Sequence, residues 1–178
     1  GLLTDVLTTV FLGHGAATMT EGRDEDEWRK RITAKLVQHN DIVVIDNVRY
    51  RLESSALSAA LTASVWEDRW LGKTAMVRAV VRMTWIATGN NPALSNEMAR
   101  RTVRIRMDSK IDRPWLRDGF RHTNLREYVA KEREKLAWSA LVLIQNWIVR
   151  GKPHGKKSLG SFENWAKVIG GIVETAGF

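Results

Sequence analysis

Two short apolar runs that each end on polar residues constrain the fold of this chain more than any other feature of its sequence. Residues 42–47 read Ile-Val-Val-Ile-Asp-Asn, and residues 84–91 read Thr-Trp-Ile-Ala-Thr-Gly-Asn-Asn. Continuous β-branched runs of this length are typical of strands buried on both faces of a parallel sheet. Because open α/β sheets bind ligands at the carboxyl ends of their strands, the polar ends predict a site for a metal-bound phosphate.

The rest of the chain alternates between helical and extended patterns and then becomes wholly helical. Helices are expected over residues 2–12, 24–38, 54–63, 92–100 and 125–150, and from a cap at Ser161 to about residue 175. Strands are expected over residues 16–20, 42–45, 83–88 and 102–107, with a hairpin over residues 66–83. This order predicts an α/β core over residues 1–113 and a helical subdomain over residues 114–178, with Trp138, Trp147 and Trp165 in the helical core.

Length and composition place the chain among ordinary globular domains. Its 178 residues, 44% of them apolar, suffice for a hydrophobic core. The sequence has no cysteine, which excludes disulfides and thiolate metal sites and fits a cytoplasmic location. Its apolar runs are too short to span a bilayer, so no membrane partner is expected. The formal net charge of +8 favours a polyanionic partner such as nucleic acid.

Asp46 and Asn90 are the residues best suited to chemistry at the strand ends. Asp46 could hold Mg²⁺, directly or through water, and Asn90 could orient a water molecule or contact a terminal phosphate. Each also has an interpretation without function. Asp46 and Asn47 can simply end a strand and begin a turn, and Asn-Asn-Pro at residues 90–92 favours a turn as well.

Arg100 and Arg101 follow these residues at the end of a short expected helix. An arginine there could reach the phosphates bound to a neighbouring subunit and stabilise the charge that is being transferred. A pair of arginines on the solvated end of a helix is the alternative interpretation.

Taken together, these motifs resemble the second half of an AAA+ ATPase core, a branch of the P-loop NTPases. The resemblance is carried by the two apolar strands, by Ala-Thr-Gly-Asn-Asn at residues 87–91, and by Leu-Ser-Asn-Glu-Met-Ala-Arg-Arg at residues 94–101. It is greatest to DNA-replication helicases and primase-helicases of phages and mobile genetic elements. The resemblance implies ATP and Mg²⁺ as cofactors, a homo-oligomeric ring such as a hexamer, and movement along single-stranded DNA.

The resemblance also implies individual roles. Asp46 matches the Walker B aspartate that positions Mg²⁺, Asn90 the first sensor, and Arg100 or Arg101 the arginine finger that acts in a neighbouring subunit. Residues 121–178 would be the helical lid. The hairpin before the sensor strand would contact DNA, and the candidate residues there are Arg69, Lys73 and Arg78.

Three departures from the family pattern modify these expectations. Asn47 replaces the usual glutamate, and its amide cannot take a proton from water. Either another carboxylate such as Glu25 or Glu27 acts as the base, or hydrolysis is poor. No phosphate-binding loop G-x-x-x-x-G-K-[ST] occurs in the chain, and the resemblance implies one just upstream. The strand before that loop lies in the centre of the family's sheet, so we expect a split sheet and weak or no ATP binding by this segment alone.

Two other functions remain open. Nine basic residues crowd residues 100–126 together with Trp115 and Phe120, a mixture that can hold a phosphate backbone and stack bases. A solvated face with a subunit interface is the alternative interpretation of this stretch. The chain could therefore be a nucleic-acid-binding module without catalysis, or an inactive ring scaffold, which Asn47 favours.

Overall fold

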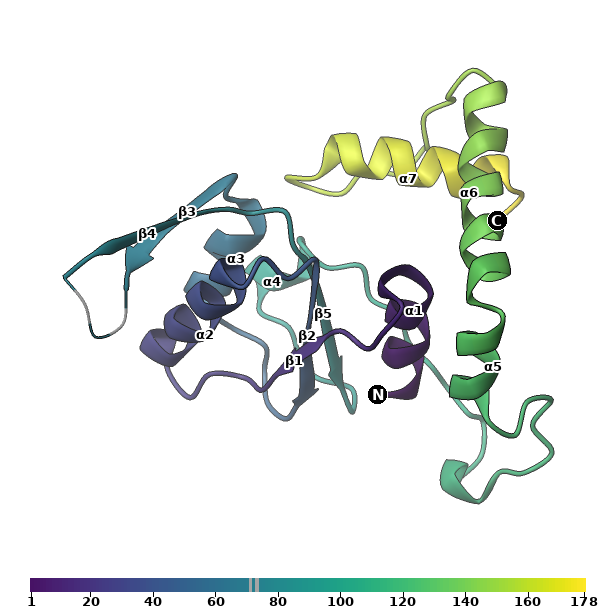
Figure 1. The fold of residues 1–178 in the computed structure, drawn as a ribbon, viewed down its shortest axis with the longest axis horizontal. Coiled ribbons are helices and arrows are strands. Elements are labelled where there is room, and N and C mark those ends of the chain that lie inside the picture. The colour runs from purple at the N-terminus through teal and green to yellow at the C-terminus, as the bar shows by residue number, and fades with distance from the viewer. Residues whose placement is uncertain (71, 73) are drawn as a thin grey trace.

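Three parallel strands form the centre of the structure, a computed structural model that describes residues 1–70, 72 and 74–178 (Figure 1). The strands are β1 (Ala17–Met19), β2 (Ile42–Val48) and β5 (Thr84–Gly89), in the order β1-β2-β5. Val43 of the central strand pairs with Ala17 on one side and with Trp85 on the other. The expected α/β fold class is confirmed at this level. The three strands form one sheet, and the expected split lies only between this sheet and residues 102–107, which do not join it.

Two of the expected strands differ from the structure. Strand β2 is buried along its apolar run, as expected, but β5 is only half-buried because it lies at the edge of the sheet. Residues 102–107, expected as a strand, are irregular, and their apolar side chains Val103, Ile105 and Met107 are exposed. An alternating pattern forms a strand only beside a partner strand, and within the described residues this segment has none.

Two helices cover one side of the sheet, and α1 (Leu2–Leu12) lies on the other (Figure 1). Both α2 (Glu25–Val37) and α3 (Ser55–Thr62) begin at the side-chain caps that the sequence predicts. Asp24 accepts a hydrogen bond from the Glu27 N–H at 2.8 Å, and Ser54 accepts one from the Leu57 N–H at 3.1 Å. Their apolar faces bury Trp28, Ile32, Leu36, Leu57 and Ala60 against the sheet.

The predicted hairpin is present as β3 (Val65–Arg69) and β4 (Met76–Val80), which pair antiparallel and extend away from the sheet (Figure 1). Its base is fixed to α2 by a short polar chain. The indole Nε1 of Trp66 donates to Thr33 Oγ1 at 2.9 Å, and that hydroxyl donates to Asp68 at 2.8 Å. Arg29 donates to the other oxygen of Asp68 at 2.9 Å, so the hairpin is anchored through buried groups.

The chain after β5 forms less helix than the sequence predicts. Helix α4 (Asn96–Ala99) begins after the cap Ser95 rather than at residue 92, because Leu94 forms an isolated bridge with Leu52. The connection from α4 to the next helix is irregular apart from the short 3₁₀ turn η1 (Pro114–Leu116), and the expected domain boundary falls within it.

The C-terminal part consists of α5 (Leu125–Lys131), α6 (Arg133–Val149) and α7 (Glu163–Thr175). The single helix expected over residues 125–150 is thus interrupted at Glu132. Ser161 does not cap α7, because its backbone adopts φ 66° and its N–H instead donates to Glu163 at 3.1 Å. No described helix is long and apolar enough to cross a bilayer.

The packing of this helical part differs from the prediction in two tryptophans. Trp147 is buried, and its indole donates to the Pro153 carbonyl at 2.8 Å. Trp138 and Trp165, expected in the core of the helices, are exposed instead. Helical periodicity identifies the apolar face of a helix but does not say whether another element covers it.

The polar chain at the base of the hairpin gives a direct test of the fold. Replacing Thr33 by valine removes the acceptor of the Trp66 indole and leaves a buried N–H without a partner. We expect the free energy of unfolding to fall by about 1–3 kcal/mol. Urea titration followed by circular dichroism measures it, with the exposed Thr123→Val as the matched control. Equal stability of the two variants would contradict the anchoring role of Thr33.

Candidate functional site

Asp46 lies at the carboxyl end of the central strand, and its carboxylate faces a neighbouring strand. The Thr88 hydroxyl at the end of β5 donates to Asp46 Oδ1 at 2.6 Å. This hydrogen bond lowers the pKa of Asp46 below its ordinary value, although desolvation acts in the opposite direction. The side chain is 45% exposed. Asp46 is therefore an ionised carboxylate that is held in place and still accessible.

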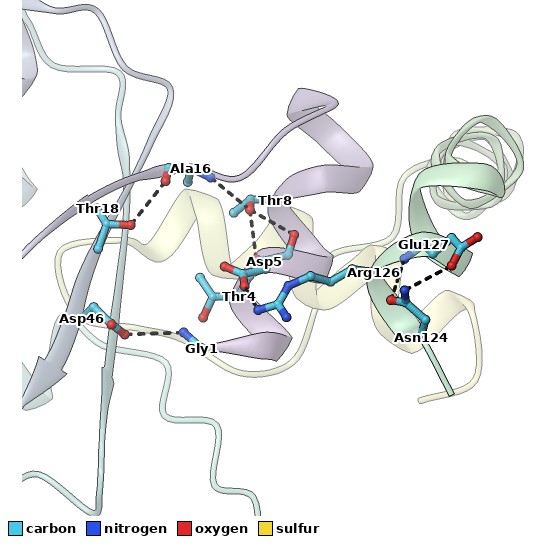
Figure 2. A network of polar contacts seen from close by, with 10 residues as sticks. All are labelled: Gly1, Thr4, Asp5, Thr8, Ala16, Thr18, Asp46, Asn124, Arg126 and Glu127. Atoms are coloured by element: carbon cyan, nitrogen blue, oxygen red, sulfur yellow. Dashed lines mark hydrogen bonds and ion pairs between the residues drawn. The ribbon is translucent and has the colours of Figure 1, made fainter. Parts of the chain in front are cut away.

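The start of helix α1 faces the same carboxylate (Figure 2). The backbone nitrogen of Gly1 lies 3.4 Å from Asp46 Oδ1. The first described turn of α1 therefore lies beside the Asp46 carboxylate at the carboxyl edge of the sheet.

The position of α1 is fixed from both sides of the helix (Figure 2). On the sheet side, Thr8 Oγ1 accepts from the Ala16 N–H at 3.3 Å, just before β1. On the other side, Arg126 of α5 forms an ion pair with Asp5 at 2.5 Å. Arg133 of α6 donates to the Thr9 carbonyl at 3.2 Å near the end of α1. The helical part thus holds the helix that faces Asp46.

Asn47 occupies a special backbone conformation next to Asp46. Its φ is 57°, and the strand register shifts between Ile45 and Val48. Asparagine adopts this left-handed conformation more readily than most residues. The Asn47 N–H donates to Thr88 Oγ1 at 3.0 Å, while its side chain is exposed. Asn47 therefore has a structural role in the turn, whatever its role in chemistry.

Asn90 follows β5 at the same edge of the sheet and is exposed. The preceding Gly89 is closely packed, since a Cβ there would lie 2.8 Å from the Val48 carbonyl oxygen. The next residue, Asn91, has φ 53° and accepts a hydrogen bond from Arg104 at 2.9 Å. This turn fixes the backbone at Asn90 and leaves its amide free to meet a ligand.

The two arginines after α4 differ in their surroundings. The Arg100 side chain is 60% exposed and lies 3.8 Å from Glu97, whereas that of Arg101 is 10% exposed and lies 3.2 Å from the same carboxylate. Arg101 also donates to the Glu97 carbonyl at 3.0 Å. Arg100 is therefore the one of the two that is available to another molecule.

The carboxylates suggested as substitutes for the missing base have structural partners. Glu25 accepts hydrogen bonds from the Ser55 and Ala56 N–H groups at the start of α3. Burial raises the pKa of Glu25, but these bonds and those of neighbouring hydroxyls lower it below its ordinary value. Glu27 pairs with Lys30 at 3.0 Å. Both carboxylates thus already serve the fold.

Glu21 is a candidate that the sequence analysis missed. It lies two residues after the end of β1, whose last pair joins Met19 to Ile45, two residues before Asn47. Its carboxylate accepts a weak hydrogen bond from the Arg49 N–H at 3.4 Å. The signal in the sequence is a glutamate directly after a short strand, but its relation to Asn47 depends on a register that the sequence does not specify.

The expected DNA-contacting residues lie on the hairpin, away from the carboxyl ends of the strands (Figure 1). Arg69 and Arg78 are exposed, and Arg78 forms an ion pair with Glu67 at 3.4 Å. Lys73 lies outside the described residues.

The donor set at Asp46 fits magnesium bound together with phosphate rather than a site made by protein alone. Within the described part of the chain, no three His, Cys, Asp or Glu side chains gather to hold a metal ion. Magnesium at nucleotide sites commonly uses one or two carboxylates and takes its other ligands from phosphates and water. One accessible carboxylate at a strand end satisfies that requirement.

Comparisons with protein-family models, curated proteins and solved structures find no match for this chain. The chemistry of the residues at the sheet edge therefore carries the functional proposal.

The hydrogen bond between Thr88 and Asp46 generates a prediction about ionisation. In Thr88→Val the pKa of Asp46 should rise toward its ordinary value of 3.8, because the bond that favours the carboxylate is gone. The stability contributed by this bond is present above the unfolded-state pKa and is lost as the pH falls through the folded-state pKa. A ¹³C carboxyl titration by NMR measures the shift. Thr84→Val, at the exposed start of the same strand, should leave Asp46 unchanged; an unshifted pKa in Thr88→Val would contradict the assignment.

Proposed function

We propose that this chain is part of an AAA+ ATP-hydrolysis module of a DNA helicase or primase-helicase, in which ATP turnover in a ring drives movement along single-stranded DNA. The observation that carries the proposal is the accessible Asp46 carboxylate near the end of the central parallel strand, which accepts a hydrogen bond from Thr88 and lies beside the first described turn of α1. A strand-end aspartate is the usual partner of the magnesium of bound phosphates.

In this proposal each residue at the sheet edge has a separate role. Asp46 would hold Mg²⁺, which would supply positive charge to offset the negative charge of the phosphates. Thr88 keeps the Asp46 carboxylate oriented and ionised through its 2.6 Å hydrogen bond. Asn90 donates its amide N–H to the terminal phosphate or to the attacking water. The backbone N–H groups at the start of α1 face the phosphates.

The free edge of β5 supports a further strand as part of the proposal. Within the described residues β5 pairs only with β2, so the backbone groups of its other edge are available to pair with a further strand. The exposed alternating side chains of residues 102–107 also suit a strand that lacks its partner. A strand that leads into a phosphate-binding loop and then into α1 would account for both features. The chain itself contains no such loop.

Proton removal from the attacking water is the step for which the usual residue is missing. The Asn47 amide cannot act as base, and Glu25 and Glu27 have structural partners. Glu21 follows β1, and its carboxylate accepts a hydrogen bond from the Arg49 N–H just after β2 at 3.4 Å. We assign it the role of base, or of orienting the water where hydrolysis is slow.

Arg100 is the finger in this proposal, because its exposed guanidinium is free to reach the phosphates in a neighbouring subunit. Arg101 instead holds the end of α4 through Glu97. The exposed Arg69 and Arg78 place positive charge on the hairpin, which suits contact with DNA phosphates. Lys73 belongs to the same proposed contact.

An inactive ring scaffold is the second candidate, and the specific observation that favours it is Asn47. Its positive φ gives the residue a structural reason to be asparagine, because asparagine adopts this conformation more readily than most residues. A scaffold would keep the ring contacts and bind nucleotide without turnover.

The proposal is tested by ATP turnover of a chain that extends upstream of Gly1 through roughly one strand and one loop, with and without single-stranded DNA. We expect magnesium-dependent turnover that rises with DNA. Asp46→Asn should abolish it, and Arg100→Ala should lower kcat by about 10³–10⁵-fold because it removes charge stabilisation in the transition state. Arg101→Ala is the matched control, which should reduce the stability of α4 more than catalysis.

Mixing the two inactive variants tests action between subunits. An Arg100→Ala subunit supplies an intact Asp46, and an Asp46→Asn subunit supplies an intact Arg100, so about a quarter of the interfaces in randomly mixed rings should be active. No recovery on mixing, with each variant still assembled, would exclude Arg100 as a finger in trans. Nucleotide binding without turnover in the unaltered chain would support the scaffold instead.

A further inference from the structure

The segment between α4 and α5 contains a basic surface that the proposed ATPase site does not use. Residues 100–126 carry nine Arg and Lys against three Asp, so most of the formal net charge of +8 lies in this stretch. Residues 103–108 and 110–121 are exposed throughout. In Figure 1 the segment runs toward the end of the molecule that lies opposite the hairpin, so the two basic surfaces are separate.

Several of these cations are already engaged. Arg100 and Arg101 lie beside Glu97, and Arg126 pairs with Asp5. Lys110 pairs with Asp108 at 3.1 Å. Arg104 donates to Asn91 at 2.9 Å.

Four arginines remain without an acidic partner within the described residues. They are Arg106, Arg113, Arg117 and Arg121, and all four are exposed. Two exposed carboxylates, Asp112 and Asp118, lie on the same segment and make no ion pair there. The segment thus keeps an excess of free guanidinium groups, which bind phosphate in a bidentate manner.

Two aromatic rings lie between these arginines in the sequence and are also exposed. Trp115 is 76% exposed and Phe120 is 56% exposed. The guanidinium of Arg117 lies 5.4 Å from the centre of the Phe120 ring. Large exposed aromatics in an irregular basic segment can stack on unpaired bases while the cations contact the backbone.

We propose that residues 104–121 form a binding surface for single-stranded nucleic acid. This surface is distinct from the hairpin, and binding to it does not require ATP. Alternating arginine and aromatic side chains over residues 113–121 fit a flexible strand whose bases are free to stack, whereas a duplex hides its base faces. The free arginines supply the phosphate contacts. This inference does not rest on the proposed ATPase function, since Asp46 and α1 take no part in it.

The test is binding of a fluorescein-labelled oligothymidylate to the 178-residue chain without ATP. The oligonucleotide has about 20 nucleotides, which is enough for one site. Anisotropy measures binding from about 50 to 300 mM salt, a range over which such affinities change steeply. With four phosphate contacts, the slope of log K against log salt should be about −3. A variant with the four free arginines changed to glutamine should lose most of this slope and bind at least about tenfold more weakly. Trp115→Ala should weaken binding about 5- to 150-fold with little change in slope.

Two control variants make the outcome specific. One changes four exposed lysines of the helical part to glutamine and so removes the same charge elsewhere; these are Lys135, Lys156, Lys157 and Lys167. The other is Arg69→Gln with Arg78→Gln on the hairpin. Circular dichroism checks that every variant is folded.

Retention of binding by the lysine control and its loss in the four-arginine and Trp115 variants would support the inference. Equal loss in the lysine variant would show attraction to net charge alone and overturn it. Loss confined to the hairpin variant would also overturn it, yet would agree with the DNA contact in the proposed helicase. Equal or tighter binding of a duplex of the same length, or no binding of either, would contradict a single-strand surface.

Discussion

The contact of the Asp46 carboxylate with Thr88 and with the start of α1 is the interaction on which the rest of this account depends. It joins the central strand, the edge strand and a helix that precedes both in the sequence. The Thr88 hydrogen bond favours the ionised carboxylate. An accessible carboxylate at a strand end is a place where Mg²⁺ bound to phosphate could be held.

The helical part of the chain stabilises this geometry without lying at the sheet edge. Arg126 pairs with the side chain of Asp5 (Figure 2). Arg133 donates to the carbonyl of Thr9. The exposed ion pair alone contributes little to stability. Together these contacts from α5 and α6 hold α1 beside the sheet edge.

Local features could be predicted from the sequence, while features that depend on distant partners could not. The capped helix starts at Asp24 and Ser54 and the buried strand at residues 42–45 each follow from neighbouring residues. Other features depend on which strands pair. They are the edge position of β5, the irregular course of residues 102–107 and the place of Glu21 just after β1. The sequence does not distinguish Arg100 from Arg101. In the structure both side chains lie near Glu97, but Arg100 is exposed and Arg101 is largely buried.

The central claim is that a magnesium nucleotide lies between Asp46 and the start of α1. Paramagnetic broadening by Mn²⁺-ATP, recorded by ¹⁵N NMR on a chain extended upstream of Gly1, tests it most directly. The account predicts that the amide signals of Asp46, Asn47 and Thr88 broaden first and that Asp46→Asn abolishes the effect. Broadening confined to the hairpin or to other acidic residues, with the sheet edge unaffected, would contradict the claim.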